Sequence, residues 1–398
     1  MGIIFSSFNG LEPLPKLRFL EFKNTYKKTK LNEAVERIQR RDPTSEAPVM
    51  MLSAASGFIM QSEKYSRENA GQSLKKYILL RKGELAYNHG ASKYKPFGCC
   101  FELKEDEARI PYVYHCFAVK ENNDKSYIAR LLNNQKIDQQ LKRLISSSVR
   151  MDGLLNISYE EYTGIDLYLP SLLEQQKIAD FLFLVDRRIE KQRQLVESLK
   201  KYKRGYFQRI ISSLETSSFE LKNIVDEYNA KSKIQNEFPI LSSTLSGIKL
   251  QNDYFNKQAA SETTIGYKIV PFGYFTYRSM SDTGEFRFNL QNIIEKGIVS
   301  PAYPVFKVKE EYNAEFVEYI LNETDNIKSQ LLIKKEGGTR YALSFSKFQT
   351  LKIDLPIKNA QDKTVSQLRF INKVLTNEER ILSNLQKLKN GLLQQMFI

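Results

Sequence analysis

The sequence predicts an α+β protein that is a tandem duplicate, with two mixed α/β globular modules joined by two long antiparallel coiled-coil helices. Two observations predict this fold class: the chain contains an internal repeat at a nearly constant offset, and each repeat ends in a heptad pattern. The length of 398 residues also exceeds what a single hydrophobic core usually serves.

The repeat is a frame of aromatic residues and glycines. At a shift of 190 positions (267 minus 77), the coinciding pairs are Leu31 and Leu221, Tyr77 and Tyr267, Gly83 and Gly273, and Tyr87 and Tyr277. Further along, the shift falls to 186 (356 minus 170), where Pro170 coincides with Pro356 and Tyr162 with Phe348. A period of this length predicts two domains, not a solenoid of short repeats.

Each repeat begins with a region of mixed secondary structure. Short apolar runs predict strands at residues 78–80, 112–114 and 165–169, and turn-forming residues separate such runs. A helical pattern covers residues 127–145. The region is therefore expected to fold as a mixed α and β module.

A heptad pattern follows each module. Residues 174–213 contain no proline, and their apolar positions recur at alternating steps of four and three. The positions expected to pair the helices are Ile178, Leu182, Val185 and Ile189 in the first copy, and Leu368, Ile371, Leu375 and Leu382 in the second. The polar interruptions also coincide, because Gln192 and Lys203 fall on Glu378 and Lys389.

These shared interruptions favour two helices that pair with each other over a helical hairpin packed on one core. A helix of this length would span about 60 Å, enough to separate two modules. The expected boundaries are 1–170 for the first module, 171–215 for the first long helix, 216–356 for the second module, and 357–398 for the second long helix.

The composition limits the class of function. The formal net charge of +14 favours a polyanionic partner such as nucleic acid. The three cysteines, Cys99, Cys100 and Cys116, have neither disulfide-framework nor metal-ligand spacing, which indicates a reducing compartment and no metal site. No apolar stretch approaches the length of a membrane span, so we expect a cytoplasmic protein with no membrane contact.

Motifs for catalysis are missing from the sequence. It has no glycine-rich nucleotide loop and no Pro-Pro pair of the kind that an amino-methyltransferase uses to hold a base. The two histidines, His89 and His115, belong to no recognisable constellation. We therefore expect a chain with no catalytic residues and no cofactor of its own.

The start of the first long helix resembles a known family. The segment from Leu169-Pro170 through Glu174-Gln175 to Ile178 and Leu182 is similar to the start of the central helix in specificity subunits of type I restriction–modification systems. The opening residues 14–19 also resemble that family's N-terminus. The second copy departs from the pattern, because Ala360-Gln361-Asp362 replaces Glu174-Gln175-Gln176.

The resemblance implies a function and partners. Each module would be a target recognition domain that reads one half of a bipartite site in double-stranded DNA. The helices, including Glu174 and Gln175, would set the spacer and dock two modification (methyltransferase) subunits. Those partners would bind S-adenosylmethionine, and restriction subunits that act as endonuclease and translocase would use ATP.

Candidate DNA-binding residues lie in polar, basic loops, where Arg, Lys, Asn and Ser can reach base edges or phosphates. In the first copy they are Lys64, Tyr65, Asn88, Ser92, Lys93, Lys95 and Arg150. In the second copy they are Tyr254, Arg278, Arg287, Lys334, Lys335 and Arg340. The loops that follow the shared Tyr-Gly frame differ strongly between copies, as two modules that read different half-sites would require.

Two alternatives stay open from the sequence. One is a self-contained DNA-modifying enzyme with an unrecognised site, and the other is a coiled-coil interaction protein without a nucleic-acid role. The recognised DNA sequence, the spacer length and the presence of a restriction subunit cannot be read from the chain.

Overall fold

The computed structural model describes residues 3–5, 14–64, 71–90, 92, 95–145, 155, 157–251, 263–336 and 340–398. The chain forms two compact units. Unit 1 comprises Met1–Arg193 and Arg380–Ile398, and unit 2 comprises Gln194–Glu379. The division falls inside the two long helices, whereas the sequence suggested boundaries at their ends.

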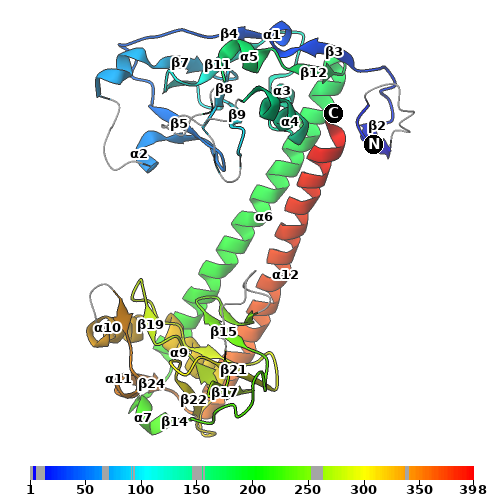
Figure 1. Cartoon of the computed structure of the whole chain (residues 1–398). Coiled ribbons are helices and arrows are strands. Elements are labelled where there is room, and N and C mark those ends of the chain that lie inside the picture. Colours follow the sequence, from blue (N-terminus) through cyan, green and yellow to red (C-terminus); the bar gives the residue numbers. More distant parts are fainter. Residues whose placement is uncertain are drawn as a thin grey trace. The chain divides into compact units, whose positions relative to one another are not determined.

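Unit 1 contains the elements of the first repeat (Figure 1). Its strands are β1 (Ile3–Phe5), β2 (Leu17–Phe19), β3 (Lys27–Lys30), β4 (Val35–Arg37), β5 (Met50–Ser53), β6 (Gly57–Met60), β7 (Ile78–Arg81), β8 (Leu85–Asn88), β9 (Cys99–Glu102), β10 (Glu107–Ile110), β11 (His115–Val119) and β12 (Asp166–Leu169). Its shorter helices are α1 (Leu31–Ala34), α2 (Gln61–Lys64), η1 (Gly71–Lys76), α3 (Lys125–Leu131), α4 (Gln135–Leu144) and α5 (Tyr159–Thr163).

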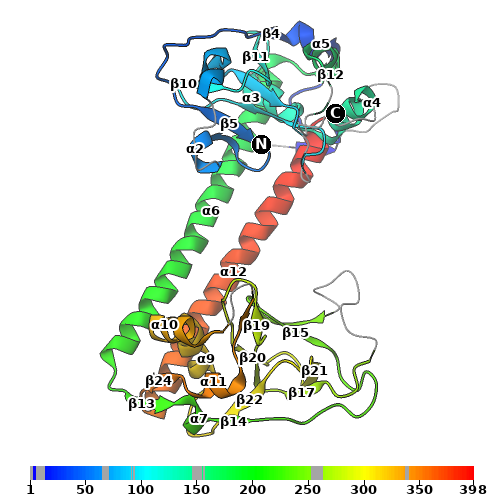
Figure 2. The same ribbon diagram turned by 60° about the vertical axis from the view of Figure 1, so that its left-hand side comes forward.

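Unit 2 repeats most of this order but has no counterpart of β1 and β2 among the described residues, and it adds the strand pair β19–β23 (Figure 2). Its strands are β13 (Ser217–Glu220), β14 (Val225–Glu227), β15 (Leu241–Thr244), β16 (Gly247–Leu250), β17 (Lys268–Pro271), β18 (Phe275–Thr276), β19 (Met280–Ser281), β20 (Asn289–Leu290), β21 (Lys296–Val299), β22 (Val305–Val308), β23 (Tyr341–Ala342) and β24 (Lys352–Leu355). Its shorter helices are α7 (Leu221–Ile224), α9 (Ala314–Glu323), α10 (Asp325–Lys334) and α11 (Phe345–Gln349).

The central sheets of the two units have equivalent topology. In unit 1 the order is β4-β11-β8-β9, and in unit 2 it is β14-β22-β18-β20. All of these strand pairs are antiparallel. The hairpin β5–β6 corresponds to β15–β16, and the pair β7–β10 corresponds to β17–β21. The repeat predicted from the sequence is therefore a repeat of structure.

Each unit has its own hydrophobic core. In unit 1 the sheet and α3 bury Phe117 and Tyr127, and in unit 2 the sheet and α9 bury Phe306 and Phe316. All four side chains are fully buried. A buried aromatic side chain contributes about 1.5–3 kcal/mol, so these residues are central to the stability of each unit.

Two predicted elements differ from the structure. Residues 112–114 are a turn and not a strand, because the Tyr114 amide bonds back to the Pro111 carbonyl at 3.1 Å and the strand β11 begins at His115. The single helix expected over residues 127–145 is two helices, α3 and α4. Asn134 ends the continuity by capping α4, accepting a hydrogen bond from the Lys136 amide at 2.9 Å.

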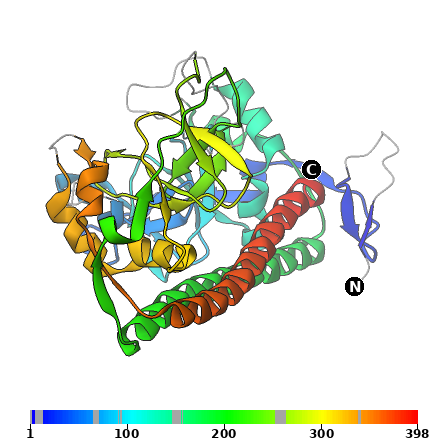
Figure 3. The same ribbon diagram turned by 90° about the horizontal axis from the view of Figure 1, so that it is seen from below.

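The two long helices are α6 (Leu172–Ser213) and α12 (Lys358–Met396), each drawn as a continuous ribbon in Figure 3. In unit 1, Ile178 and Leu182 of α6 share a core with Leu392 and Met396 of α12. In unit 2, Phe207 of α6 shares a core with residues 365–371 of α12. The predicted fold class is confirmed: the chain has two mixed α/β modules and two long antiparallel helices.

Candidate nucleic-acid interface

A glycine and a tyrosine fix the strand that precedes the first candidate loop in each unit. Gly83 has a φ of 88° and Gly273 a φ of 80°, values in the left-handed region that favours glycine. Tyr87 and Tyr277 are buried, and their hydroxyls donate to the carbonyls of Phe97 and Leu343. The frame seen in the sequence is thus structural, and the loops begin directly after it.

In unit 1 the candidate loop residues turn inward. Asn88 donates from Nδ2 to the Leu52 carbonyl at 3.2 Å and accepts from the Gly90 amide at 2.9 Å. Ser92 accepts from the Lys95 amide at 3.1 Å, and Lys95 Nζ donates to the Asn133 carbonyl at 3.0 Å. These side chains shape the loop, and all three are half-buried.

In unit 2 a pair of short strands brings together two candidate loops that are far apart in the sequence. The short strand β19 pairs with β23 in the register Met280 to Ala342 and Ser281 to Tyr341. This pairing places Arg278 and Arg340 on neighbouring segments, and both bind the carboxylate of Asp282. The Nζ of Lys335 lies 3.9 Å from the centroid of the Tyr341 ring.

A cleft of about 860 Å³ lies beside this strand pair. Its walls include β15 with the turn of the β15–β16 hairpin, residues of the segment from Arg278 to Glu285, Arg287, and Tyr303. The hairpin contributes serine and threonine hydroxyls as well as Leu245, which is 60% exposed. Arginine, hydroxyl and apolar groups side by side are the groups with which proteins read the edges of DNA bases.

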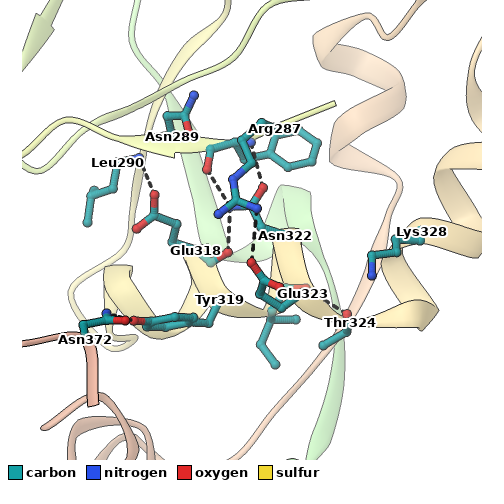
Figure 4. A network of polar contacts seen from close by, with 12 residues as sticks. Arg287, Asn289, Leu290, Glu318, Tyr319, Asn322, Glu323, Thr324, Lys328 and Asn372 are labelled. Atoms are coloured by element: carbon teal, nitrogen blue, oxygen red, sulfur yellow. Dashed lines mark hydrogen bonds and ion pairs between the residues drawn. The ribbon is translucent and has the colours of Figure 1, made fainter. Parts of the chain in front are cut away.

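The other candidates in unit 2 have partners within the unit. Arg287 pairs with Glu323 at 3.1 Å while lining the cleft (Figure 4). Lys334 Nζ donates to the carbonyl and the hydroxyl of Thr350. Arg287 therefore keeps access to a ligand in the cleft, whereas Lys334 also caps the end of α11.

Several candidates cannot be placed. Tyr65, Lys93, Arg150 and Tyr254 lie outside the described residues, and of Lys64 only the position in α2 is described. They stay predictions from the sequence.

The structure places Glu174 and Gln175 differently from the expectation that they contact a partner or pair the helices. Glu174 is buried and accepts two hydrogen bonds from the Arg18 guanidinium, at 2.8 and 2.9 Å, and one from the Tyr26 hydroxyl. The ion pair raises the pKa of Arg18. The two segments that resemble the specificity subunits, residues 14–19 and the start of α6, thus bind each other inside unit 1.

Gln175 anchors α6 to unit 1, and sequence reasoning missed that unit 2 has the same anchor. Gln175 Oε1 accepts from the Asp124 amide at 2.9 Å, and Nε2 donates to the Pro170 carbonyl at 3.0 Å. Gln361 accepts from the Asn313 amide at 2.9 Å and donates to the Pro356 carbonyl at 2.7 Å. The shift of 186 places Gln175 on Gln361 and was the available signal.

Sequence reasoning also missed a second repeated contact, although Asn133 and Asn322 coincide at a shift of 189 positions (322 minus 133). Each asparagine uses its side-chain amide to bind both backbone groups of one residue: Asn133 binds the N–H and the carbonyl of Cys100 in β9, and Asn322 binds those of Phe288, directly before β20. Figure 4 shows Asn322 on α9. Asn133 lies between α3 and α4, so each asparagine joins the helical part of its unit to a segment next to the candidate loops.

The apolar positions of the heptad pattern in the long helices are at least half-buried. Ile178, Leu182, Ile189 and Leu368 are buried, and Val185, Ile371, Leu375 and Leu382 are half-buried.

Two of the polar residues that interrupt the heptad pattern contact side chains of their own unit. Lys389 pairs with Asp186 at 2.6 Å in unit 1, and Lys203 lies over the Tyr319 ring at 5.0 Å in unit 2. Burial lowers the pKa of Lys203.

The two histidines pack against each other in unit 1. Their rings stack with centroids 5.0 Å apart, and both nitrogens of His89 lie 2.8 Å from carbonyl oxygens, those of Leu155 and Val113. Burial lowers the pKa of His115 to about 4. Both rings serve packing and backbone contacts.

The described part of the chain offers neither a metal site nor a membrane span. There, no group of three or more His, Cys, Asp or Glu side chains could hold a metal ion. The same residues include no helix that is both long and apolar enough to span a membrane. The three cysteines are buried free thiols.

The fold is similar to that of solved structures from type I restriction–modification systems. A chain from a structure on complex assembly and conformational transition of the type I R-M system covers 95% of this chain and 98% of its own length, at 15% identity and a TM-score of 0.55. The S subunit of a type I system from M. genitalium covers 97% and 99%, at 13% identity and a TM-score of 0.56. No protein-family model and no curated protein matches the sequence.

Proposed function

Because the chain has the fold of type I restriction–modification S subunits, we propose that it is the sequence-specificity subunit of such a complex. Each module would read one half of a bipartite DNA site. The long helices would set the spacer and dock two modification subunits. The chain itself would do no chemistry.

The observation that carries this proposal is a shared frame with different loops. Gly83 and Gly273, Tyr87 and Tyr277, and Gln175 and Gln361 occupy equivalent positions. Both glycines have a positive φ, both tyrosine hydroxyls donate to a backbone carbonyl of their own unit, and both glutamines accept from an equivalent backbone amide. The residues that follow the frame differ, because Asn88 bonds inward while Arg278 lines a cleft. One scaffold with two different polar surfaces suits recognition of two different half-sites.

The charge supports a DNA partner. The net charge of +14 supplies phosphate contacts, which add affinity without sequence information. Arginines and hydroxyls on the cleft of unit 2 supply base contacts, which add the sequence information. S-adenosylmethionine would bind the modification subunits, and ATP would bind a restriction subunit.

The test is genome-wide mapping of methylated adenine in cells that carry this chain and its native partners. We expect methylation at one bipartite sequence, lost when this chain alone is deleted. The purified chain, incubated with DNA and labelled S-adenosylmethionine, should transfer no methyl group. Transfer without a partner would support a self-contained enzyme instead, and methylation unaffected by the deletion would reject the proposal.

A further inference from the structure

One carboxylate, that of Asp282, pairs with two arginines in unit 2: Arg278 on the wall of the cleft and Arg340 on the neighbouring segment. Asp282 Oδ1 lies 3.0 Å from Nε of Arg340, and Oδ2 lies 3.9 Å from Nη2 of Arg278. All three side chains are half-exposed or more, so a ligand can reach the guanidinium groups. Among the described residues, Asp282 is the acidic group that pairs with both arginines.

The segment that carries Asp282 is held in place by its own turn. Ser281 Oγ accepts a hydrogen bond from the Gly284 amide at 3.0 Å, which closes the turn. Gly284 has a φ of 78°, and a Cβ there would meet Lys335 Nζ at 2.5 Å and Tyr341 Cδ2 at 3.0 Å. Glycine is therefore required, and the turn packs closely on the neighbouring strand.

The segment of Arg340 is fixed by backbone pairing. Ala342 bonds in both directions with Glu336, at 3.0 and 2.8 Å, and the Leu343 amide bonds to the Ser279 carbonyl at 2.9 Å. The two arginines therefore lie beside a pair of hydrogen-bonded strands: Arg278 two residues before β19 and Arg340 directly before β23. An arginine whose backbone is held in place before DNA binds loses less conformational entropy on binding.

The two arginines pair with Asp282 through different nitrogen atoms, so they differ in the donors that stay available to a ligand. Arg340 meets the carboxylate through Nε, which leaves both Nη groups as a pair of parallel donors. Arg278 meets it through Nη2, which takes part of that donor edge. We propose that Arg340 is a specificity-determining residue that reads guanine through O6 and N7, and that Asp282 is the positioning residue that aims it.

This inference rests on the proposed function and adds the base that one residue reads. Two parallel N–H donors match the two acceptors that guanine presents in the major groove. Arg278 then supplies a second cation for the adjacent phosphate or base. In unit 1 the residue equivalent to Arg278 is Asn88, which binds the Leu52 carbonyl, so that position supplies no second arginine there.

The test maps adenine methylation in cells whose full-length chain carries Arg340→Lys, Arg340→Gln or Asp282→Asn, with the native partners present. Arg340→Lys keeps the charge but removes the paired donors. Lys328→Gln is the control, because Lys328 pairs with Asp325 on the surface of α10 in the same unit. Discrimination for guanine at one position of one half-site should fall about 5- to 150-fold for both Arg340 variants.

Asp282→Asn should relax the same position as the Arg340 variants, and the control should leave the consensus unchanged. The other half-site should be unaffected in every variant. An unchanged consensus, or a uniform loss of methylation with no relaxed position, would overturn the assignment. Failure of the proposed function is a separate result, since the wild-type chain would then direct methylation to no bipartite site.

Discussion

At the scale of residues, the buried pair between Arg18 and Glu174 joins residues 14–19 to the start of α6, the two segments that resemble type I specificity subunits. Its glutamate is only 1% exposed and joins segments 156 positions apart in the chain. Removing one partner of a buried ion pair destabilises the folded protein, because the other charge is left buried without a counter-ion. In unit 2 the equivalent position holds Ala360, so no carboxylate is buried there.

The substitution Glu174→Gln is therefore expected to destabilise unit 1 by about 3–5 kcal/mol, because it leaves the Arg18 guanidinium buried without its counter-ion. The measurement is urea unfolding followed by circular dichroism. Asp106→Asn is the control, since Asp106 is 93% exposed in its pair with Lys82 and should change stability by less than about 1 kcal/mol. Equal effects of the two substitutions would contradict the structural role of Glu174.

His115 gives unit 1 a dependence of stability on pH. Burial is the main cause that lowers its pKa to about 4, and the neighbouring His89 and Arg37 act in the same direction, whereas Glu160 opposes them. The unfolded chain, with a histidine pKa near 6.5, therefore binds a proton between about pH 6.5 and about pH 4 that the folded chain does not bind. The neutral, buried His115 is therefore compatible with full stability of unit 1 above about pH 6.5, and the folded state loses stability as the pH falls from about 6.5 to about 4.

We expect His115→Gln to reduce that loss by about 1–3 kcal/mol between about pH 7 and about pH 4. The free energy of unfolding, measured at several pH values for both proteins, checks the expectation. Parallel curves for the two proteins would show that His115 does not carry the dependence.

At the scale of elements, the glutamine at the start of each long helix fastens that helix to its own module. Replacing Gln175 or Gln361 with alanine would leave a backbone amide and a proline carbonyl without these bonds. Each substitution should cost about 1–3 kcal/mol. Hydrogen exchange should show the effect confined to the unit that carries the change, and an effect spread over both units would contradict separate anchoring.

The elements also show how far the sequence could be interpreted. The heptad pattern of the long helices was predictable because burial restricts its positions to apolar residues. The repeated glycines were predictable because a positive φ favours glycine. The turn at residues 112–114 was not, because its apolar residues resemble a strand and only the Pro111–Tyr114 hydrogen bond distinguishes it.

The candidate site was only partly predictable. The polar loops of unit 2 were identified, but their union by β19 and β23 is a contact between distant segments with no periodic signal. The inward contacts of Asn88 and Lys95 were equally unpredictable, because solvated and structural polar residues have the same composition.

At the scale of the whole molecule, the long helices are proposed to set the spacer between half-sites. Removing one heptad from each of α6 and α12 keeps the seam in register and shortens each helix by about 10 Å. The spacer in the methylated sequence should then shorten by about three base pairs. A spacer of unchanged length, with both half-sites still read, would contradict the ruler role.

The central claim is that each module reads its own half-site. An exchange of residues 219–356 for the corresponding module of a type I S subunit with a different target tests it most directly, with adenine methylation mapped across the genome. The account predicts that one half of the site changes to that of the donor while the other half is unchanged. A change in both halves, or in neither, would contradict it.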